Sequence, residues 1–421
     1  MIEKIESIKK FNFWETRPQT GYKRSVYLKR LQKSRDSNLV KVLVGQRRVG
    51  KSFVLRQVID SLIDTGVDAK RTLYINKEYT EYDFIRNYED LIELVNVFTE
   101  KLPENELFYL FVDEIQNIQN WEKAINSLSQ DFTRRISIFI TGSNAQLLSG
   151  ELATYLSGRY IKFLILPFSF SEYAGITKKE TNKATYLEFL QSGGLPELFH
   201  LPDDESKRQY LSAIYDTVIL RDVLQRHHLR DVSLLKDIFA FIVNNISNPF
   251  SVNSIFDFLK QQRKTNYETI AQYIGFLEDA YIIHRCERYN IKGKEILKGT
   301  VKFYLNDLSF KNYLYPGFKH GWGYLLENLI FLELLNHEYE VYVGHLKNKE
   351  IDFIAKKNQR QLYVQAAYQL ESSDTREREY NALLSIADNY EKIIVSTDDI
   401  PQPIHEGVKN ISAWDFEGVL A

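Results

Sequence analysis

The feature that most constrains this chain is a glycine-lysine-serine motif between an apolar run and a stretch with helical spacing. The motif reads Gly45, Gln46, Arg47, Arg48, Val49, Gly50, Lys51 and Ser52. Glycines let the backbone wrap around phosphate, and free N–H groups at a helix start attract anions, so this is a phosphate-binding loop, or P-loop. We expect Lys51 to reach the β and γ phosphates of ATP and the Ser52 hydroxyl to hold Mg²⁺. The strand, loop and helix together disfavour the alternative, a glycine turn before an ordinary helix.

A second motif places two carboxylates, Asp113 and Glu114, directly after the apolar run at residues 107–112. Two acids at the end of a buried strand are unfavourable unless something uses their charge. Asp113 has the chemistry to hold the water shell of Mg²⁺, and Glu114 to position and polarise an attacking water. Acids at strand ends also occur as helix caps. The two carboxylates indicate a nucleotide site because they follow a P-loop.

Two further places are candidates for contact with the γ phosphate. Ser143 and Asn144 follow the apolar run at residues 136–141, where either polar side chain could act as a sensor; turn formation is the alternative. Arg159 is a second candidate, because an arginine near the γ phosphate stabilises transition-state charge. A surface ion pair explains Arg159 at least as well, and whether it acts in its own subunit or in a neighbour's is left open.

The first part of the chain alternates short apolar runs with amphipathic stretches. This alternation predicts an α/β fold of the P-loop NTPase type, with a parallel sheet covered by helices on both faces. The expected strands have few polar residues, as a sheet buried on both sides requires. They are residues 39–44, 72–76, 107–112, 136–141 and 161–166. We assign residues 1–204 to this ATPase domain.

The rest of the chain divides into two expected domains. Residues 205–305 are expected to form a helical and winged-helix domain, in which helices at 252–262 and 267–279 precede a hairpin with a glycine turn. Residues 306–421 are expected to form an α/β domain with an initial helix, several strands and a charged helix.

Local charge makes DNA a candidate partner of the winged-helix region. The whole chain gives no such signal, because its 54 basic and 56 acidic residues leave a net charge of −2. Residues 251–305 contain nine basic and six acidic residues. Arg263 and Lys264 precede the second helix, and Lys292 and Lys294 occupy the wing, which fits a helix in the major groove with the wing on the backbone. The alternative is that the region packs against the ATPase and binds no DNA.

Cysteine content and hydropathy place the chain in the cytoplasm. Cys286 is its single cysteine, so no intramolecular disulfide and no cysteine-based zinc site can form. The first six residues include Glu3, Lys4 and Glu6 where a signal peptide would be apolar, and the apolar runs are far shorter than the ~20 residues of a membrane helix. We expect no membrane association.

Taken together, these motifs resemble a large family of prokaryotic AAA-type ATPases. The matching residues are 45–52, 112–114, 141–143, 157–160, 167–170 and 193–196. Members of that family carry a winged-helix segment and a C-terminal domain similar to restriction endonucleases. The resemblance covers nearly the whole chain and is most specific at the P-loop. It implies binding and hydrolysis of ATP and says little about the macromolecular substrate.

The resemblance also directs attention to residues 306–421. Restriction-endonuclease-like sites use a glutamate on a helix, an aspartate on a strand and a Glu-x-Lys on the next strand; the carboxylates hold Mg²⁺ and the lysine activates water. Glu327 and Asp352 match the first two parts, but Gln365 and Ala367 stand where the last glutamate and the lysine are expected. We therefore expect a retained fold that does not cut DNA.

The functional expectation is an ATP-driven switch or motor that acts on a macromolecule, with DNA as the first candidate. The main alternative is a signalling ATPase whose C-terminal domains bind a protein partner without DNA. An ATP-dependent nuclease is a third reading, which the missing lysine disfavours. Formation of a homo-oligomer would allow Arg159 to act on the ATP of a neighbouring subunit.

Overall fold

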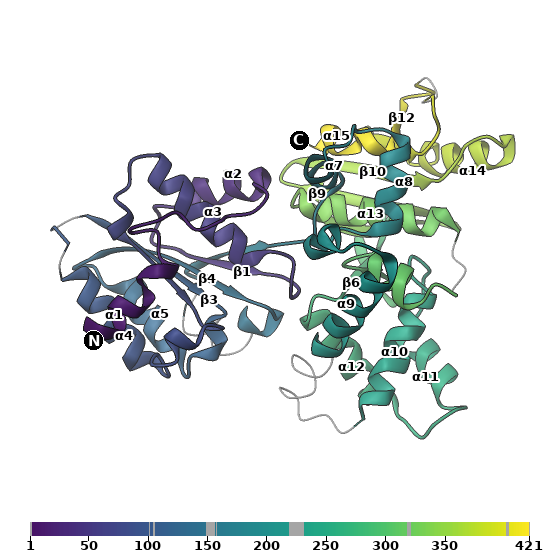
Figure 1. Ribbon diagram of the computed structural model, residues 1–421. Coiled ribbons are helices and arrows are strands. Elements are labelled where there is room, and N and C mark those ends of the chain that lie inside the picture. Colours follow the sequence, from purple (N-terminus) through teal and green to yellow (C-terminus); the bar gives the residue numbers. More distant parts are fainter. Residues whose placement is uncertain are drawn as a thin grey trace. The chain divides into compact units, whose positions relative to one another are not determined.

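The computed structural model describes residues 2–100, 102–103, 106–148, 156, 158–218, 231–317, 321–400 and 404–420 (Figure 1). The chain forms two compact units, residues 1–165 and residues 166–421, and each unit has its own β-sheet. Among the described residues, the structure contains no helix with the length and apolar character needed to cross a bilayer.

The first unit is built on a parallel sheet of five strands in the order β2-β3-β4-β1-β5. The strands are β1 (Val40–Val44), β2 (Thr72–Asn76), β3 (Leu107–Asp113), β4 (Arg135–Gly142) and β5 (Tyr160–Leu164). The helices are α1 (Ile2–Ile8), α2 (Ser25–Ser34), α3 (Lys51–Asp64), α4 (Tyr88–Thr99) and α5 (Trp121–Gln130). All residues of β1, β2 and β3 are buried, because α2 and α3 lie over one face of the sheet and α4 and α5 over the other (Figure 1). The predicted α/β fold is confirmed.

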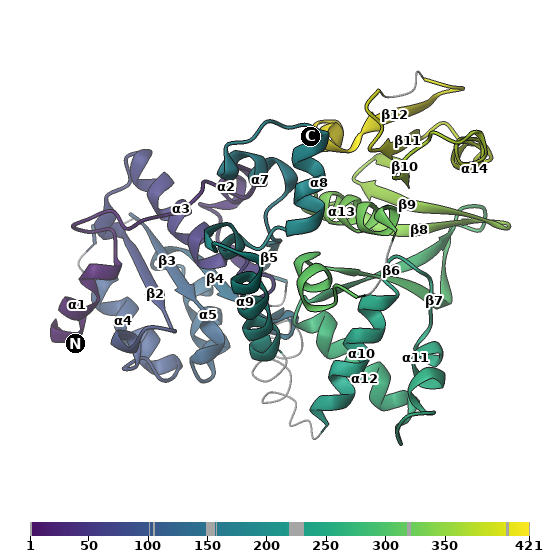
Figure 2. The same cartoon turned by 45° about the vertical axis from the view of Figure 1, so that its right-hand side comes forward.

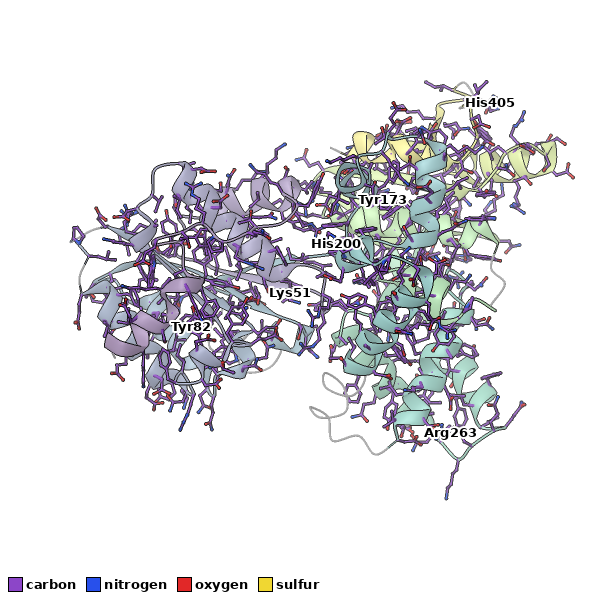
Figure 3. The ribbon with its side chains drawn as sticks, in the orientation of Figure 1. Lys51, Tyr82, Tyr173, His200, Arg263 and His405 are labelled. Atoms are coloured by element: carbon purple, nitrogen blue, oxygen red, sulfur yellow. The ribbon has the colours of Figure 1, made fainter. Side chains whose placement is uncertain are left out.

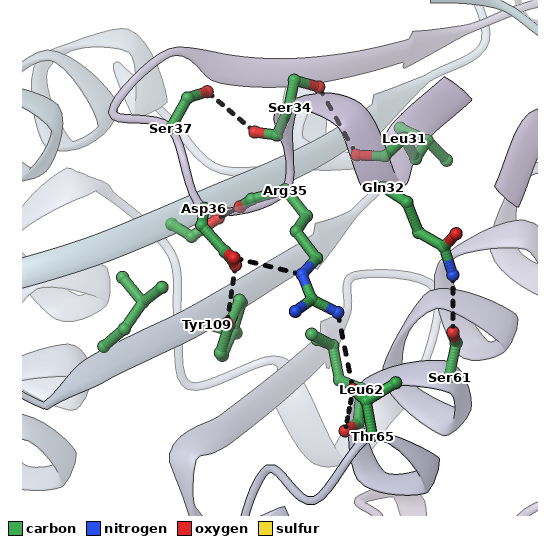
Figure 4. A network of polar contacts seen from close by, with 12 residues as sticks. Leu31, Gln32, Ser34, Arg35, Asp36, Ser37, Ser61, Leu62, Thr65 and Tyr109 are labelled. Carbon is green, nitrogen blue, oxygen red and sulfur yellow. Dashed lines mark hydrogen bonds and ion pairs between the residues drawn. The ribbon is translucent and has the colours of Figure 1, made fainter. Parts of the chain in front are cut away.

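Side chains from α2, α3 and β3 hold the turn that leads into β1 (Figure 4). Tyr109 donates its hydroxyl hydrogen bond to Asp36 Oδ1 at 2.8 Å, and Arg35 Nε donates to Asp36 Oδ2 at 3.1 Å. Arg35 also donates to Thr65 Oγ1, at the end of α3, over 3.4 Å. These contacts fix where β1 begins and hence where the P-loop follows it.

The second unit opens with six described helices. They are α7 (Phe170–Thr177), α8 (Lys183–Ser192), α9 (Asp204–Thr217), α10 (Val232–Asn244), α11 (Val252–Leu259) and α12 (Tyr267–Asp279). Each is preceded by a side chain that accepts a hydrogen bond from a backbone N–H of the first turn, and these caps are Ser169, Asn182, Asp203, Asp231, Ser251 and Asn266. Serine, asparagine and aspartate at these positions are the sequence signal for a helix start.

A mixed sheet of seven strands forms the core of the second unit, in the order β12-β11-β10-β9-β8-β6-β7 (Figure 2). Its strands are β6 (Ile283–Asn290), β7 (Glu295–Leu305), β8 (Glu340–Leu346), β9 (Lys349–Lys357), β10 (Arg360–Ala367), β11 (Glu391–Ser396) and β12 (Val408–Ser412). The helices α13 (Trp322–Asn336), α14 (Ser373–Leu384) and α15 (Phe416–Leu420) accompany it. Most of α13 is buried, which explains why its sequence is apolar nearly all round.

The hairpin of β6 and β7 belongs to this sheet. Residues 288–290 of β6 pair in parallel with residues 343–345 of β8. The helix, helix, strand, turn, strand order expected for residues 251–305 is present as α11, α12, β6 and β7. The compact units, however, meet between residues 165 and 166, whereas sequence patterns suggested boundaries after residues 204 and 305. Strands before and after residue 305 belong to one sheet. The division into three domains therefore stays a prediction from the sequence.

Candidate nucleotide-binding site

The P-loop connects the carboxyl end of β1 to the first residue of α3, Lys51, which is labelled in Figure 3. Gly45 has a φ of 149°, and a Cβ added there would lie 2.2 Å from the carbonyl oxygen of Ile165. Gly50 caps α3 in the left-handed conformation, with a φ of 95°. Close backbone approach at Gly45 and positive φ at Gly50 therefore both require glycine.

The middle of the loop is fixed by its surroundings. Gln46 and Val49 are buried, and Arg47 forms an ion pair with Glu78 at 3.3 Å. Arg24, also buried, donates from Nη1 to the carbonyl oxygen of Val49 at 3.2 Å. Sequence analysis did not identify Arg24, because nothing in its local pattern distinguishes it from an exposed arginine before a helix.

Lys51 is folded back over the loop. Its Nζ donates to the carbonyl oxygens of Gly45 at 2.9 Å and Gln46 at 3.0 Å, and it lies 4.0 Å from Glu114 Oε1. The side chain is buried, so these contacts satisfy a charge that would otherwise be costly. The ammonium is thus held directly beside the loop that is expected to receive phosphate.

Asp113 ends β3 at the same edge of the sheet and is fully buried. Its Oδ1 accepts from Thr141 Oγ1 at 2.5 Å, and its Oδ2 accepts from Tyr74 Oη at 2.9 Å and from Asn76 Nδ2 at 3.2 Å. The Ser52 side chain also hydrogen-bonds to this carboxylate. The two residues predicted to hold Mg²⁺ are therefore in contact with each other.

The pKa of Asp113 lies above its ordinary value. Burial is the largest cause, and the neighbouring charge of Glu114 raises the pKa further, while hydrogen bonds from Ser52, Thr141 and Tyr74 lower it. These three donors are neutral hydroxyl groups, which favour the ionised carboxylate less than a neighbouring positive charge would. A bound cation would supply the positive charge that the neutral donors around this carboxylate lack.

Tyr74 and Asn76 are site residues that sequence analysis missed. Both are on β2, and Asn76 pairs with Asp113 in the strand register. The available signal was the alternation of Thr72, Tyr74 and Asn76 with the apolar Leu73 and Ile75 along this strand. Using that signal required knowing that β2 lies next to β3.

Glu114 has a left-handed backbone, with φ 53° and ψ 50°, which is uncommon for a residue with a side chain. Its N–H donates to Thr141 Oγ1 at 2.9 Å, and Gln116 Nε2 donates to its carboxylate. The strained turn sends the Asp113 and Glu114 side chains in different directions from consecutive positions. Glu114 consequently faces Lys51, while Asp113 faces Ser52.

Ser143 and Asn144 follow β4, whose Gly142 pairs with Val44, the residue before the P-loop. Both side chains are buried, and the Ser143 hydroxyl has no hydrogen-bond partner among the described residues. The carbonyl of Asn144 accepts from the N–H of Leu147, which begins a short helical turn. Both residues thus lie at the same sheet edge as the P-loop, and a role for either in sensing phosphate stays a prediction.

Arg159 is not near these residues in its own chain. Its carbonyl oxygen accepts from the N–H of Val40 at 3.0 Å, which places it at the amino end of β1. The P-loop starts at the other end of that strand, five residues away at ~3.3 Å each. An arginine side chain cannot cover this length, so Arg159 does not complete the nucleotide site of the same chain.

The residues predicted for the second unit fall into two places. Arg263, labelled in Figure 3, forms ion pairs of 2.6 Å with both Asp231 and Asp237, and its contact with DNA stays a prediction. Lys264, Lys292 and Lys294 are exposed. Glu327, Asp352 and Gln365 line one pocket, and its likeness to a restriction-endonuclease site stays a prediction.

Comparisons with known proteins agree with the geometry of the site. Residues 37–174 match the family model described as an AAA domain, and residues 183–320 match a domain of unknown function. An uncharacterized protein of Haemophilus influenzae is 35% identical over 93% of this chain and 98% of its own length. An uncharacterized protein of Methanocaldococcus jannaschii is 33% identical over 91% of this chain and 86% of its own.

Two solved structures resemble the chain at low sequence identity. The Walker-type ATPase of Pyrococcus abyssi is 15% identical, with 72% of this chain and 99% of that chain covered and a TM-score of 0.45. The Orc1 protein of Aeropyrum pernix in complex with DNA is 14% identical, with 73% and 96% covered and a TM-score of 0.32. The family assignment therefore rests on sequence rather than on these two structures. The chain belongs to the same family as the two uncharacterized relatives, and its residues 37–174 are an AAA-type P-loop ATPase domain.

Proposed function

We propose that the first unit binds ATP with Mg²⁺ and hydrolyses it to ADP and phosphate. The observation that carries the proposal is the buried Asp113, whose pKa the Ser52 side chain lowers, beside Glu114, whose Oε1 lies 4.0 Å from Lys51 Nζ. These four residues come from the P-loop and from the end of a neighbouring strand. They combine anion-binding, cation-binding and base chemistry at one edge of the sheet.

The P-loop residues bind and orient the phosphates. Lys51 presently donates to two backbone carbonyls, and a phosphate offers it a charged acceptor and hence a stronger hydrogen bond. The Ser52 hydroxyl and the Asp113 carboxylate are the hard oxygen donors that Mg²⁺ prefers, directly or through water. When bound, Mg²⁺ neutralises charge that develops on the β and γ phosphates.

Glu114 is proposed to orient the water that attacks the γ phosphorus and to accept its proton as the bond to the leaving ADP oxygen breaks. Its turn is fixed by Thr141, and its carboxylate by Gln116. Both contacts hold the base in place before the nucleotide arrives, which is how positioning contributes to catalysis.

ATP affinity of the full chain, measured by calorimetry with Mg²⁺, tests the binding step. Lys51→Ala is expected to weaken binding by ~10 to 100-fold, since hydrogen bonds to charged groups contribute about 1.5–3 kcal/mol. Lys70→Ala is the matched control, because Lys70 is exposed and precedes β2 at the opposite edge of the sheet. Equal ATP affinity of wild type and Lys51→Ala would reject this assignment of the P-loop.

The protein is further proposed to act as a switch or motor on a macromolecule in the cytoplasm, with duplex DNA as the first candidate. The favouring observation is that Lys264, at the end leading into α12, and Lys292 and Lys294, in the β6–β7 turn, are all exposed. Stimulation of ATP turnover by duplex DNA that falls steeply with salt would support DNA contact. Turnover indifferent to DNA would favour the alternative, a signalling ATPase with a protein partner.

The second unit is proposed not to cut DNA. Ala367 cannot supply the activated water or the charge stabilisation that phosphodiester hydrolysis needs, and Gln365 is neutral. The assay is incubation of linear, supercoiled and branched DNA with Mg²⁺ or Mn²⁺ and ATP. Cleavage that disappears in Asp352→Ala would restore the nuclease alternative.

A further inference from the structure

A lysine far away in the sequence lies among the carboxylates of the pocket in the second unit. Lys302, on β7, places its Nζ 2.9 Å from Glu327 Oε1, 2.8 Å from Glu350 Oε1 and 3.8 Å from Asp352 Oδ1. The three acids come from α13 and β9. Lys302 is only 2% exposed, so this ammonium is a structural part of the unit rather than a surface charge.

The surrounding hydrogen bonds keep the acids in position. Tyr304 Oη donates to Glu327 Oε1 at 2.7 Å, and the N–H of Ala366 donates to Asp352 Oδ2 at 2.8 Å. The Asp352 N–H donates to Gln365 Oε1 at 3.2 Å. Gln365 is therefore occupied in holding the backbone of β9, which a glutamate at the same place would also do.

Glu327 and Asp352 are buried and Glu350 is partly exposed. Buried carboxylates that share a neighbour favour a positive charge between them, because their mutual repulsion is weakly screened away from water. In metal-dependent sites a divalent ion supplies that charge. Here the Lys302 ammonium lies within hydrogen-bond distance of Glu327 and Glu350 and forms a longer ion pair with Asp352 instead. A divalent ion at the same carboxylates would have to lie within a few ångströms of Lys302 and be repelled by it.

We propose that Lys302 is the built-in cation of this pocket, standing where a divalent metal would otherwise neutralise Glu327, Glu350 and Asp352. The charge of the pocket is then balanced without metal. The absence of a lysine at position 367, where Ala367 stands, fits a pocket in which a fixed internal charge takes the place of a metal ion. The pocket belongs to the second unit, and its charge balance does not depend on ATP hydrolysis by the first.

The test measures Mn²⁺ binding to the full chain without nucleotide, by electron paramagnetic resonance, together with thermal unfolding. Lys302→Met removes the cation and leaves the acids in place. It is expected to unfold at a lower temperature than wild type, to gain one Mn²⁺ site, and to recover stability when Mn²⁺ is added. Lys302→Arg keeps the charge and is the matched control, with no added site expected.

The same measurement on Asp352→Asn decides the question even if Lys302→Met does not fold. The proposal expects Mn²⁺ binding by wild type and by Asp352→Asn to be equal, since the pocket of the wild type takes no metal. A wild-type Mn²⁺ site that disappears in Asp352→Asn would overturn the proposal. So would a folded Lys302→Met variant that gains no site, or one whose added site persists when Asp352→Asn is combined with it.

Discussion

At the scale of single residues, the nucleotide site depends on two consecutive acids whose side chains point in different directions. Asp113 and Glu114 are neighbours in sequence, yet one is bound to Tyr74, Asn76 and Thr141 and the other faces Lys51. The left-handed backbone of Glu114 produces this separation. The proposed binding of Mg²⁺ and the proposed activation of water therefore fall to different acids.

The P-loop and both acids could be predicted from sequence, because each requires particular residue types at a fixed spacing. Tyr74 and Asn76 could not, because their contact with Asp113 depends on which strands are neighbours. Lys302 was missed for the same reason, since its contact with Glu327 joins β7 to α13 and leaves no local signal in the sequence. Residues supplied by tertiary pairing carry no local signal.

Lys41 gives a prediction at this scale. It is fully buried on β1, and its Nζ donates to the Ser37 carbonyl at 2.9 Å and to Ser137 Oγ at 2.8 Å. Burial lowers its pKa from 10.5 to about 7, while Asp36 acts in the opposite direction. Between these two values the unfolded chain binds more protons than the folded one, so this group makes stability rise as pH increases.

The measurement is chemical denaturation of wild type and Lys41→Met at several pH values from 7 to 10. The stability of wild type relative to the variant should increase with pH, by at most about 1.4 kcal/mol per pH unit. Lys33→Met, which replaces an exposed lysine of α2, is the control. A stability difference that does not change over this range would contradict a lowered pKa for Lys41.

At the scale of elements, the first sheet was predictable and the second was only partly so. The five strands of the first unit are apolar runs whose parallel pairing follows from alternation with helices. In the second unit, β6 and β7 form a local hairpin and also extend the sheet through the pairing of β6 with β8. Local patterns revealed the hairpin, but the pairing of distant strands is decided by packing.

The β6–β7 turn and the start of α12 carry the prediction about DNA. Reversing charge at Lys264, Lys292 and Lys294 together should weaken duplex binding. The slope of the logarithm of affinity against the logarithm of salt concentration should become shallower by about 1 for each phosphate that the variant no longer touches. Fluorescence anisotropy with labelled duplex across a salt series measures both quantities. ATP affinity should be unchanged.

Arg263→Ala is the control for that triple variant, since its ion pairs with Asp231 and Asp237 commit it to the structure. Its expected effect is a loss of stability of at most about 1 kcal/mol, because the aspartates are partly exposed. No detectable duplex binding by wild type at low salt would remove the DNA hypothesis. A greater loss of binding in Arg263→Ala than in the triple variant would show that the wrong surface was assigned.

At the scale of the whole molecule, Arg159 raises the question of assembly. It lies at the amino end of β1, away from the P-loop, so any contact with a γ phosphate has to be made in another copy of the chain. If it is such a finger, Arg159→Ala should retain ATP affinity and lose turnover by ~10³-fold. Turnover per chain of wild type should also rise with protein concentration.

Mixing variants separates this arrangement from a structural role. Arg159→Ala keeps its own Glu114, and Glu114→Gln keeps its own Arg159, so a mixture should turn over ATP faster than either variant alone. Unchanged turnover by Arg159→Ala, measured by phosphate release, would show that Arg159 has no role in ATP hydrolysis.

The central claim is that this protein hydrolyses ATP with Glu114 as the base, and one comparison tests it most directly. Phosphate release and ATP affinity are measured side by side for wild type, Glu114→Gln and Glu89→Gln, whose altered residue is exposed on α4. The account predicts that all three bind ATP, that wild type and Glu89→Gln turn it over equally, and that Glu114→Gln is slower by ~10² to 10⁴-fold, the usual contribution of a general base. Turnover by Glu114→Gln at the wild-type rate would contradict the account.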